Sequence, residues 1–197
     1  MSEKEALEAA FEALIGELFG ADAPRMVPGE GPAHAKLMLI GEAPGEQESI
    51  EGRPFVGRAG KNLDRFLELA QLRREEIYIT NAVKFRPTRE GKREKPVNRT
   101  PTEKEIDLFR PLLWREIRMM QPELIVTLGN VPLRAVTGEK ITVGEAHGHI
   151  LKKTVEGIPL FALYHPASVI YNRSLLAVYE QDVRALGALC RENAAAL

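Results

Sequence analysis

The sequence contains a single cysteine, Cys190, among its 197 residues. A disulfide within the chain is therefore impossible, as is any metal cluster that needs four cysteines of the chain. No apolar run approaches the roughly 20 residues that a membrane-spanning helix requires. The first residues are acidic where a signal peptide would be basic. These absences predict a cytoplasmic protein in which Cys190 serves as a small apolar side chain.

A strong net charge is also missing, because the formal charge is −1. The overall balance thus gives no indication of nucleic-acid binding, and the distribution of charge matters more. Between residues 84 and 99 basic side chains outnumber acidic ones: Lys84, Arg86, Arg89, Lys92, Arg93, Lys95 and Arg99 against Glu90 and Glu94. Such a run is either a solvated loop or a set of phosphate contacts, and a nearby site motif favours phosphate contacts.

Short apolar runs alternate with segments of helical periodicity, and no repeat or linker divides residues 1–197. Expected strands cover 36–41, 77–81, 124–128 and 159–164. Expected helices cover 3–19, 56–72, 103–120, 131–136 and 174–195. Segment 84–99 is too polar and proline-rich to be regular, and 141–164 alternates in the manner of β structure. We predict one α/β domain, a three-layer α/β/α sandwich with a four-stranded, mainly parallel central sheet.

Four loops follow the predicted strands, at 41–48, 81–84, 129–130 and 165–168. In an open parallel sheet, ligands bind beyond the carboxyl ends of the strands. We therefore expect these loops to meet in space and to form the functional site.

The first loop, GEAPGEQE, combines two glycines and a proline with three carboxylates. It is not a Walker phosphate loop, because no GxxxxGK[ST] occurs and Glu42, Glu46 and Glu48 would repel a phosphate. Taken alone, the loop is equally consistent with an ordinary strand-to-helix turn with solvated glutamates.

Three further side chains give the expected site a more specific character. His165, at the end of the last strand, could donate a hydrogen bond or a proton to a substrate atom. Phe55 lies in a loop and could stack on a flat ligand, and Asn81 offers the donor and acceptor that suit a nucleobase edge. Together with a carboxylate and a basic loop, they predict a pocket for a base extruded from DNA.

The ordered motifs resemble the uracil-DNA glycosylase superfamily, most closely its family 4, the iron–sulfur type. They are GEAPGEQE, EGRPFVGRAGKNLD, YITNAVKFRP, NRTPTEKE, LIVTLGN and YHPASVI. The likeness covers residues 28–187, after an N-terminal helix and loop at 1–27. It implies a monomeric, monofunctional enzyme of base excision repair, which hydrolyses the N-glycosidic bond of uracil in DNA and leaves an apyrimidinic site.

The resemblance also implies roles for individual residues. Phe55 would stack on the flipped uracil, Asn81 would bind its pairing edge, and His165 would bind the oxygen on which negative charge develops. Glu42 would position water or stabilise the cationic sugar, and Glu48 would support the pocket near the uracil C5 edge. The other implied contacts are Ala43 with uracil, and Lys84, Arg86, Arg99 and Ser168 with DNA.

The sequence departs from the family at its cluster. Family 4 holds a [4Fe–4S] cluster with four cysteines, but the third and fourth positions here are Phe85 and Phe109, and no cysteine precedes Arg25. We therefore predict no iron and no other cofactor, with the packing of large apolar side chains in place of the cluster. The family's Arg-Gly after the third strand is His147-Gly148 here.

Other interpretations remain open at the level of sequence. The enzymatic alternative is a glycosylase for another deaminated base, such as hypoxanthine. The non-enzymatic alternative is a module that binds damaged or single-stranded DNA. A metal site made of His147, His149, Glu145 and His165 is a further alternative, although solvent-facing polar residues on a strand explain that pattern equally well.

Overall fold

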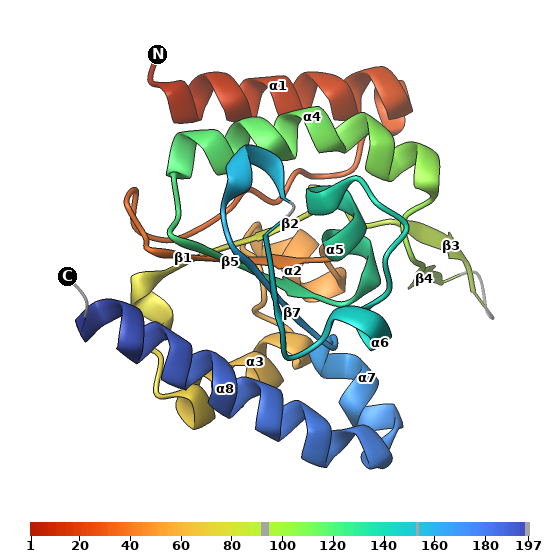
Figure 1. The fold of residues 1–197 in the computed structure, drawn as a ribbon. Helices are drawn as coiled ribbons and strands as arrows, with labels where there is room; N and C mark the ends of the chain where they lie inside the picture. Colours follow the sequence, from red (N-terminus) through yellow and green to blue (C-terminus); the bar gives the residue numbers. More distant parts are fainter. Residues whose placement is uncertain (92–94, 153, 196–197) are drawn as a thin grey trace.

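The computed structural model describes residues 1–91, 95–152 and 154–195 (Figure 1). Its helices are α1 (Glu3–Phe19), α2 (Glu46–Glu51), α3 (Arg58–Ala70), α4 (Glu103–Met120), α5 (Asn130–Thr137), α6 (Val143–Ala146), α7 (Pro166–Tyr171) and α8 (Leu176–Ala195). Short 3-10 turns are η1 (Gly20–Asp22), η2 (Arg74–Glu76), η4 (Val155–Gly157) and η5 (Arg173–Leu175). Within the described residues, no helix is both long and apolar enough to cross a membrane.

The central sheet consists of β1 (Leu37–Gly41), β2 (Ile77–Asn81), β5 (Leu124–Leu128), β6 (Ile150–Leu151) and β7 (Leu160–Leu163). Its order is β2-β1-β5-β7-β6, with every pair parallel except the antiparallel β6–β7 edge. Helices α1 and α4 pack together on one face, and α3 and α8 pack together on the other (Figure 1). The predicted three-layer α/β/α sandwich is confirmed.

The prediction of four strands was wrong, because the described sheet has five. The additional strand, β6, has two residues, which is too short for a periodic pattern to reveal. Part of the same segment, 141–164, is the helical turn α6 rather than β structure. The side chain of Glu145 accepts hydrogen bonds from the amide and the hydroxyl of Thr142 there and so caps the turn.

Burial on both faces explains why the parallel strands are apolar throughout. In β1, Met38 and Ile40 belong to the core beneath α1 and α4, whereas Leu37 and Leu39 belong to the core beneath α3 and α8. Successive side chains of a strand point to opposite faces, so one short apolar run supplies both cores. The sheet is therefore a rigid base for the loops at its carboxyl edge.

The segment 84–99 contains an antiparallel hairpin where we predicted irregular structure. Its strands are β3 (Thr88–Glu90) and β4 (Pro96–Asn98), and the hairpin projects from the body of the molecule (Figure 1). Both strands are exposed, so no alternation of apolar residues could indicate them. Three residues of the predicted basic run lie outside the described residues: Lys92, Arg93 and Glu94.

Candidate active site

A cleft of about 1180 Å³ lies at the carboxyl edge of the sheet. It is lined by most of the residues that the sequence proposed for a site: Glu42, Ala43, Glu48, Phe55, Asn81, Arg99, His165 and Ser168. Three of the four expected loops thus meet there. The loop at 129–130 does not line the cleft, but a side chain at Gly129 would press on the Cβ atom of His165, so this loop lies directly behind the histidine.

Phe55 and Asn81 lie side by side because strand pairing places Gly41 opposite Asn81. A Cβ atom at Gly41 would collide with both the Asn81 side-chain oxygen and the Phe55 ring. Only glycine therefore allows the aromatic ring and the amide to approach each other at this strand end. Both side chains are buried at the base of the cleft. This geometry gives a flat apolar surface next to a paired donor and acceptor.

His165 is the N-cap residue of α7, and its Nδ1 accepts a hydrogen bond from the Ala167 amide at 3.1 Å. Burial lowers the pKa of His165 to about 4, so the ring is neutral at physiological pH. Because Nδ1 is an acceptor, the proton of the neutral ring resides on Nε2. The site therefore contains a neutral imidazole N–H donor.

Two carboxylates of the cleft, the half-buried Glu42 and the buried Glu48, have different surroundings. Burial raises the pKa of Glu42, and a hydrogen bond from the Thr100 side chain opposes that rise. Glu48 lies in α2, and its Oε1 accepts a hydrogen bond from the Gly57 amide at 2.9 Å, at the N-terminus of α3. Glu48 thus joins two helices around the cleft, whereas the partner of the Glu42 carboxyl is the Thr100 side chain. Glu46 is exposed and lies 3.4 Å from Arg86.

Lys84 is not a DNA contact, and that prediction was wrong. Its side chain is 0% exposed and its Nζ donates to Glu116 at 2.6 Å, to the Asn81 carbonyl at 2.9 Å and to the Thr80 hydroxyl. The Tyr78 hydroxyl also donates to Glu116, at 3.0 Å. Burial lowers the pKa of Lys84, and Glu116 opposes that effect. The lysine therefore supports the end of β2 from within.

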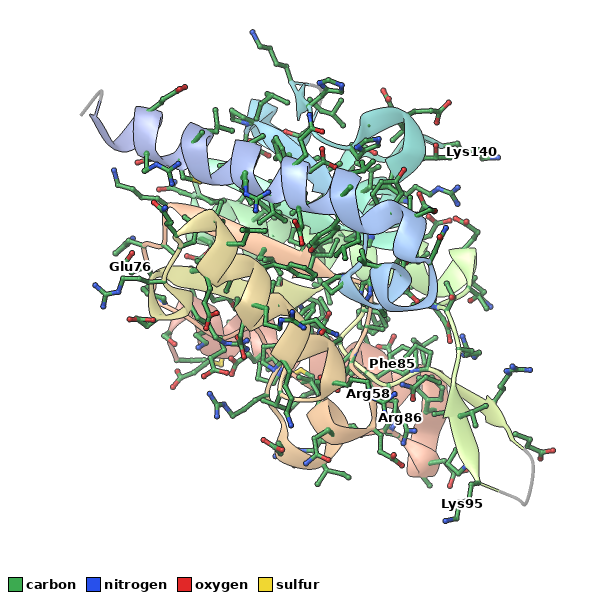
Figure 2. All side chains as sticks on the ribbon, turned by 90° about the horizontal axis from the view of Figure 1, so that it is seen from below. Arg58, Glu76, Phe85, Arg86, Lys95 and Lys140 are labelled. Atoms are coloured by element: carbon green, nitrogen blue, oxygen red, sulfur yellow. The ribbon has the colours of Figure 1, made fainter. Side chains whose placement is uncertain are left out.

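Other basic side chains of the 84–99 segment do reach the surface beside the cleft. Arg86 donates to the Asn98 side chain at 2.7 Å, and Arg99 forms a bidentate pair with Glu105 at 2.7 Å for each bond. Figure 2 shows Arg86 near the base of the hairpin and Lys95 pointing into solvent at its far end. Arg86 and Arg99 thus both bond to other side chains of the protein, which orient them at the edge of the cleft.

Phe85 and Phe109 form part of a buried aromatic cluster. Their ring centroids are 5.6 Å apart, Phe19 lies 4.9 Å from Phe85, and Phe11 lies 6.0 Å from Phe109. The two positions that the family resemblance assigned to cluster ligands thus pack against the N-terminal helix α1. Phenyl rings offer no metal-ligand atom, and Cys190 lies on α8 in the opposite helical layer. These residues do not fit an iron–sulfur cluster.

Two of the residues considered as metal ligands, His147 and Glu145, have other partners. His147 Nδ1 lies 2.8 Å from Asp182 Oδ2, and Glu145 is engaged in the cap of α6. In the part of the chain that the structure describes, no group of three or more His, Cys, Asp or Glu residues is placed to hold a metal ion.

Sequence reasoning missed residues whose role depends on distant partners. Three residues belong to this group: Thr100, which lies next to Glu42; Glu116, which pairs with Lys84; and Arg74, which bonds to the Phe55 backbone. Glu116 carried a weak signal, because it is an acidic residue among the apolar positions of an amphipathic helix.

Residues 28–186 match the sequence profile of the family described as "Uracil DNA glycosylase superfamily". The chain belongs to this superfamily. Its type-4 uracil-DNA glycosylase relatives include that of Saccharolobus solfataricus, 42% identical over 165 residues, which are 80% of this chain and 73% of the relative. The relative from Sulfurisphaera tokodaii is 41% identical, with 80% and 71% covered. That from Archaeoglobus fulgidus is 36% identical, with 83% and 81% covered. The expected closeness to family 4 is confirmed.

Proposed function

We propose that this protein is a monofunctional uracil-DNA glycosylase of base excision repair. It hydrolyses the N-glycosidic bond of uracil in DNA and leaves an apyrimidinic site. The observation that carries the proposal is the meeting of Phe55, Asn81, His165 and Glu42 in one cleft. The similarity to proteins named type-4 uracil-DNA glycosylases supports it. We further propose that it acts as a single-domain monomer in the cytoplasm, with DNA as its partner.

The pocket recognises the base through Phe55 and Asn81. The aromatic ring stacks on the face of the extruded uracil, which contributes roughly 1–3 kcal/mol for a base on an aromatic side chain. The Asn81 amide pairs with the uracil edge, and Ala43 contacts the base from the loop after β1. The Gly41 position keeps the ring and the amide close enough to act on the same base.

Two groups then favour the breaking of the bond between C1′ of deoxyribose and N1 of uracil. The bonding electron pair leaves with the base, and the sugar becomes oxocarbenium-like. The Nε2–H of neutral His165 donates to the uracil oxygen on which the negative charge grows. Glu42, as a carboxylate, stabilises the cationic sugar or orients the water that attacks C1′. Glu48 acts indirectly, because its hydrogen bond from the Gly57 amide fixes the loop near the C5 edge of the uracil.

DNA-backbone contacts come from the rim of the cleft. Arg99 and Ser168 line the cleft, and Arg86 lies beside it through its bond to Asn98. Positive side chains at a cleft edge attract phosphates with a salt-dependent affinity. Lys84 is not among them, because it is buried.

We propose that the protein works without an iron–sulfur cluster. The rings of Phe85 and Phe109 stabilise the segment after β2 by contact with α1. The purified protein should contain no stoichiometric iron and should show no visible absorption band. A brown protein with about four irons per chain, the content of one [4Fe–4S] cluster, would overturn this part of the proposal.

The activity is tested with duplex oligonucleotides that carry one uracil, one thymine or one hypoxanthine at the same position. After incubation with the protein, alkali should cleave the uracil strand alone, because alkali breaks DNA at an abasic site. Cleavage of the hypoxanthine strand instead would identify a glycosylase for another deaminated base. Binding without any cleavage would identify a non-catalytic DNA-binding module.

Acid should slow excision as Glu42 takes up a proton. Burial raises the pKa of Glu42, and only its charged form stabilises a cation, so the rate should fall as pH drops through that raised pKa. His165 does not interfere, because its ring stays neutral until the pH approaches about 4. Single-turnover rates measured from acid to mildly alkaline pH check this profile.

Two variants sharpen the test. Thr100→Val removes the hydrogen bond that favours the charged form of Glu42, so the acid limb should move to higher pH. Glu42→Gln should remove the limb and lower the rate throughout. An acid limb that stays unchanged in both variants would assign it to another group.

A further inference from the structure

Phe55 adopts a backbone conformation that few residues with a side chain adopt. Its φ is 53°, in the left-handed region. This conformation is unfavourable for a bulky residue and persists only where surrounding groups enforce it. Phe55 also lies in a loop between α2 and α3, outside regular secondary structure. Some group must therefore hold this peptide in place.

Arg74 provides that restraint from 19 residues further along the chain. Its Nη2 donates to the carbonyl oxygens of Pro54 and Phe55, at 3.1 Å each. Its Nη1 donates to the carboxylate of Asp64 on α3, at 2.8 Å. The guanidinium thus joins the turn before β2, the loop that carries Phe55 and the helix that follows this loop. A planar, charged donor with several N–H groups suits such a bridge better than an ammonium group.

The packing around Phe55 shows why these two carbonyl contacts matter. A Cβ atom at Gly60 would collide with the carbonyl oxygen of Phe55, so α3 lies directly against this oxygen. On the other side, the edge of the ring lies against Gly41. A change in the φ of Phe55 turns the Pro54 and Phe55 carbonyls relative to each other, so it would break at least one of the two bonds to Arg74. It would also turn the ring away from Asn81.

We propose that Arg74 is a positioning residue, which fixes the Phe55 ring in the orientation that stacks on the extruded base. Arg74 is not among the residues that line the cleft, so it acts through Phe55 and not on the substrate. The inference rests on the role of Phe55 given under the proposed function. It predicts that loss of Arg74 weakens recognition of the base but not of the DNA backbone.

The test compares Arg74→Gln with the matched control Arg73→Gln. Arg73 is the exposed neighbour of Arg74, and its partners are Glu75 and Glu76. Three quantities are measured: the single-turnover excision rate, the inhibition constant of free uracil, and the affinity for DNA that already contains an abasic site. Thermal melting of each variant reports its stability.

Arg74→Gln should slow excision and raise the uracil inhibition constant by about 10-fold each, the size expected when a hydrogen bond from a charged donor is lost. Its affinity for abasic DNA should stay within about 2-fold of wild type, because the rim residues are untouched. Arg73→Gln should behave as wild type in all three measurements. Arg74→Lys keeps the charge and one donor group, so it should recover part of the loss. An unchanged uracil inhibition constant in Arg74→Gln would overturn the proposal.

A second set of variants separates this inference from the proposed role of Phe55. Phe55→Ala should weaken uracil binding by roughly 10-fold or more. In that background, Arg74→Gln should add little, because no ring is left to position. Full additivity of the two changes would overturn the role of Arg74 while leaving that of Phe55 intact. Wild-type activity of Phe55→Ala itself would show instead that the assignment of the pocket is wrong.

Asp64→Asn addresses the case in which Arg74→Gln fails to fold. Asp64 is half-exposed and bonds to Nη1 of Arg74, whereas Nη2 makes both carbonyl bonds, so its loss leaves those bonds possible. The variant should raise the uracil inhibition constant by about 2- to 3-fold, as expected for an exposed ion pair. No change in this constant would count against the proposal.

Discussion

Replacement of His165 by alanine should slow uracil excision by about 10²-fold or more. The Nε2–H of the neutral ring is the donor assigned to the leaving base, and the loss of one such donor to a developing oxyanion costs about 10²–10³ in rate. Single-turnover kinetics with a uracil-containing duplex measure this change directly. The exposed His149 does not line the cleft, so His149→Ala is the control and should be as active as wild type.

His165 also caps α7, so the alanine variant combines two effects. Loss of the cap alone should cost about 0.5–2 kcal/mol in stability. His165→Asn separates the two roles, because asparagine is a good N-cap whose shorter side chain does not reach the position of Nε2. We expect this variant to melt like wild type and still to excise uracil slowly. Excision at the wild-type rate by the asparagine variant would remove His165 from the mechanism.

Replacement of Lys84 by methionine should lower the free energy of unfolding by about 3–5 kcal/mol, the loss typical when one partner of a buried ion pair is removed. The carboxylate of Glu116 would stay buried and keep its bonds from Tyr78 and Thr80, but it would lose its positively charged partner. Urea denaturation of wild type and variant measures the difference. Since Lys84 also donates to the Asn81 carbonyl, excision should slow as well.

Two controls test whether burial is the cause. The exposed pair of Lys36 and Glu123, 3.2 Å apart, is a matched surface case, and Lys36→Met should cost about 0–1 kcal/mol. The double variant Lys84→Met with Glu116→Leu should recover much of the stability, because no unpaired charge is left inside. A Lys84→Met protein within about 1 kcal/mol of wild type would mean that Glu116 finds other compensation.

The sequence predicted the sheet well, because strands covered on both faces must be apolar along their whole length. The run Leu37-Met38-Leu39-Ile40 is recognisable for that reason and supplies both cores. The exposed hairpin at β3 and β4 and the two-residue β6 lack such a constraint. The hairpin was not predicted, and β6 was not predicted as a strand of the sheet, although segment 141–164 was expected to contain β structure. These strands form because their backbones hydrogen-bond to an adjacent strand, and their side chains show no periodic pattern that would reveal this pairing.

The candidate site was predictable where a residue lies at a strand end. Asn81 and His165 each follow an apolar strand, so the fold alone brings them to one edge of the sheet. Lys84 shows the opposite case. It stands three residues after Asn81 in a run of basic residues, and local charge indicated a solvated phosphate contact. The burial of its side chain depends on the ion pair with Glu116, which lies 32 residues away in the sequence, on helix α4.

By itself, the sequence determined the α/β fold, the sheet edge at which the cleft lies and the family of the chain, because these follow from patterns within short stretches of the sequence. Only the tertiary structure decided which charges are available. It paired Lys84 with Glu116, put the proton of His165 on Nε2, and placed Arg74 on the carbonyl of Phe55. Burial and hydrogen-bond partners fix these states, and both arise from segments that meet only in the folded chain.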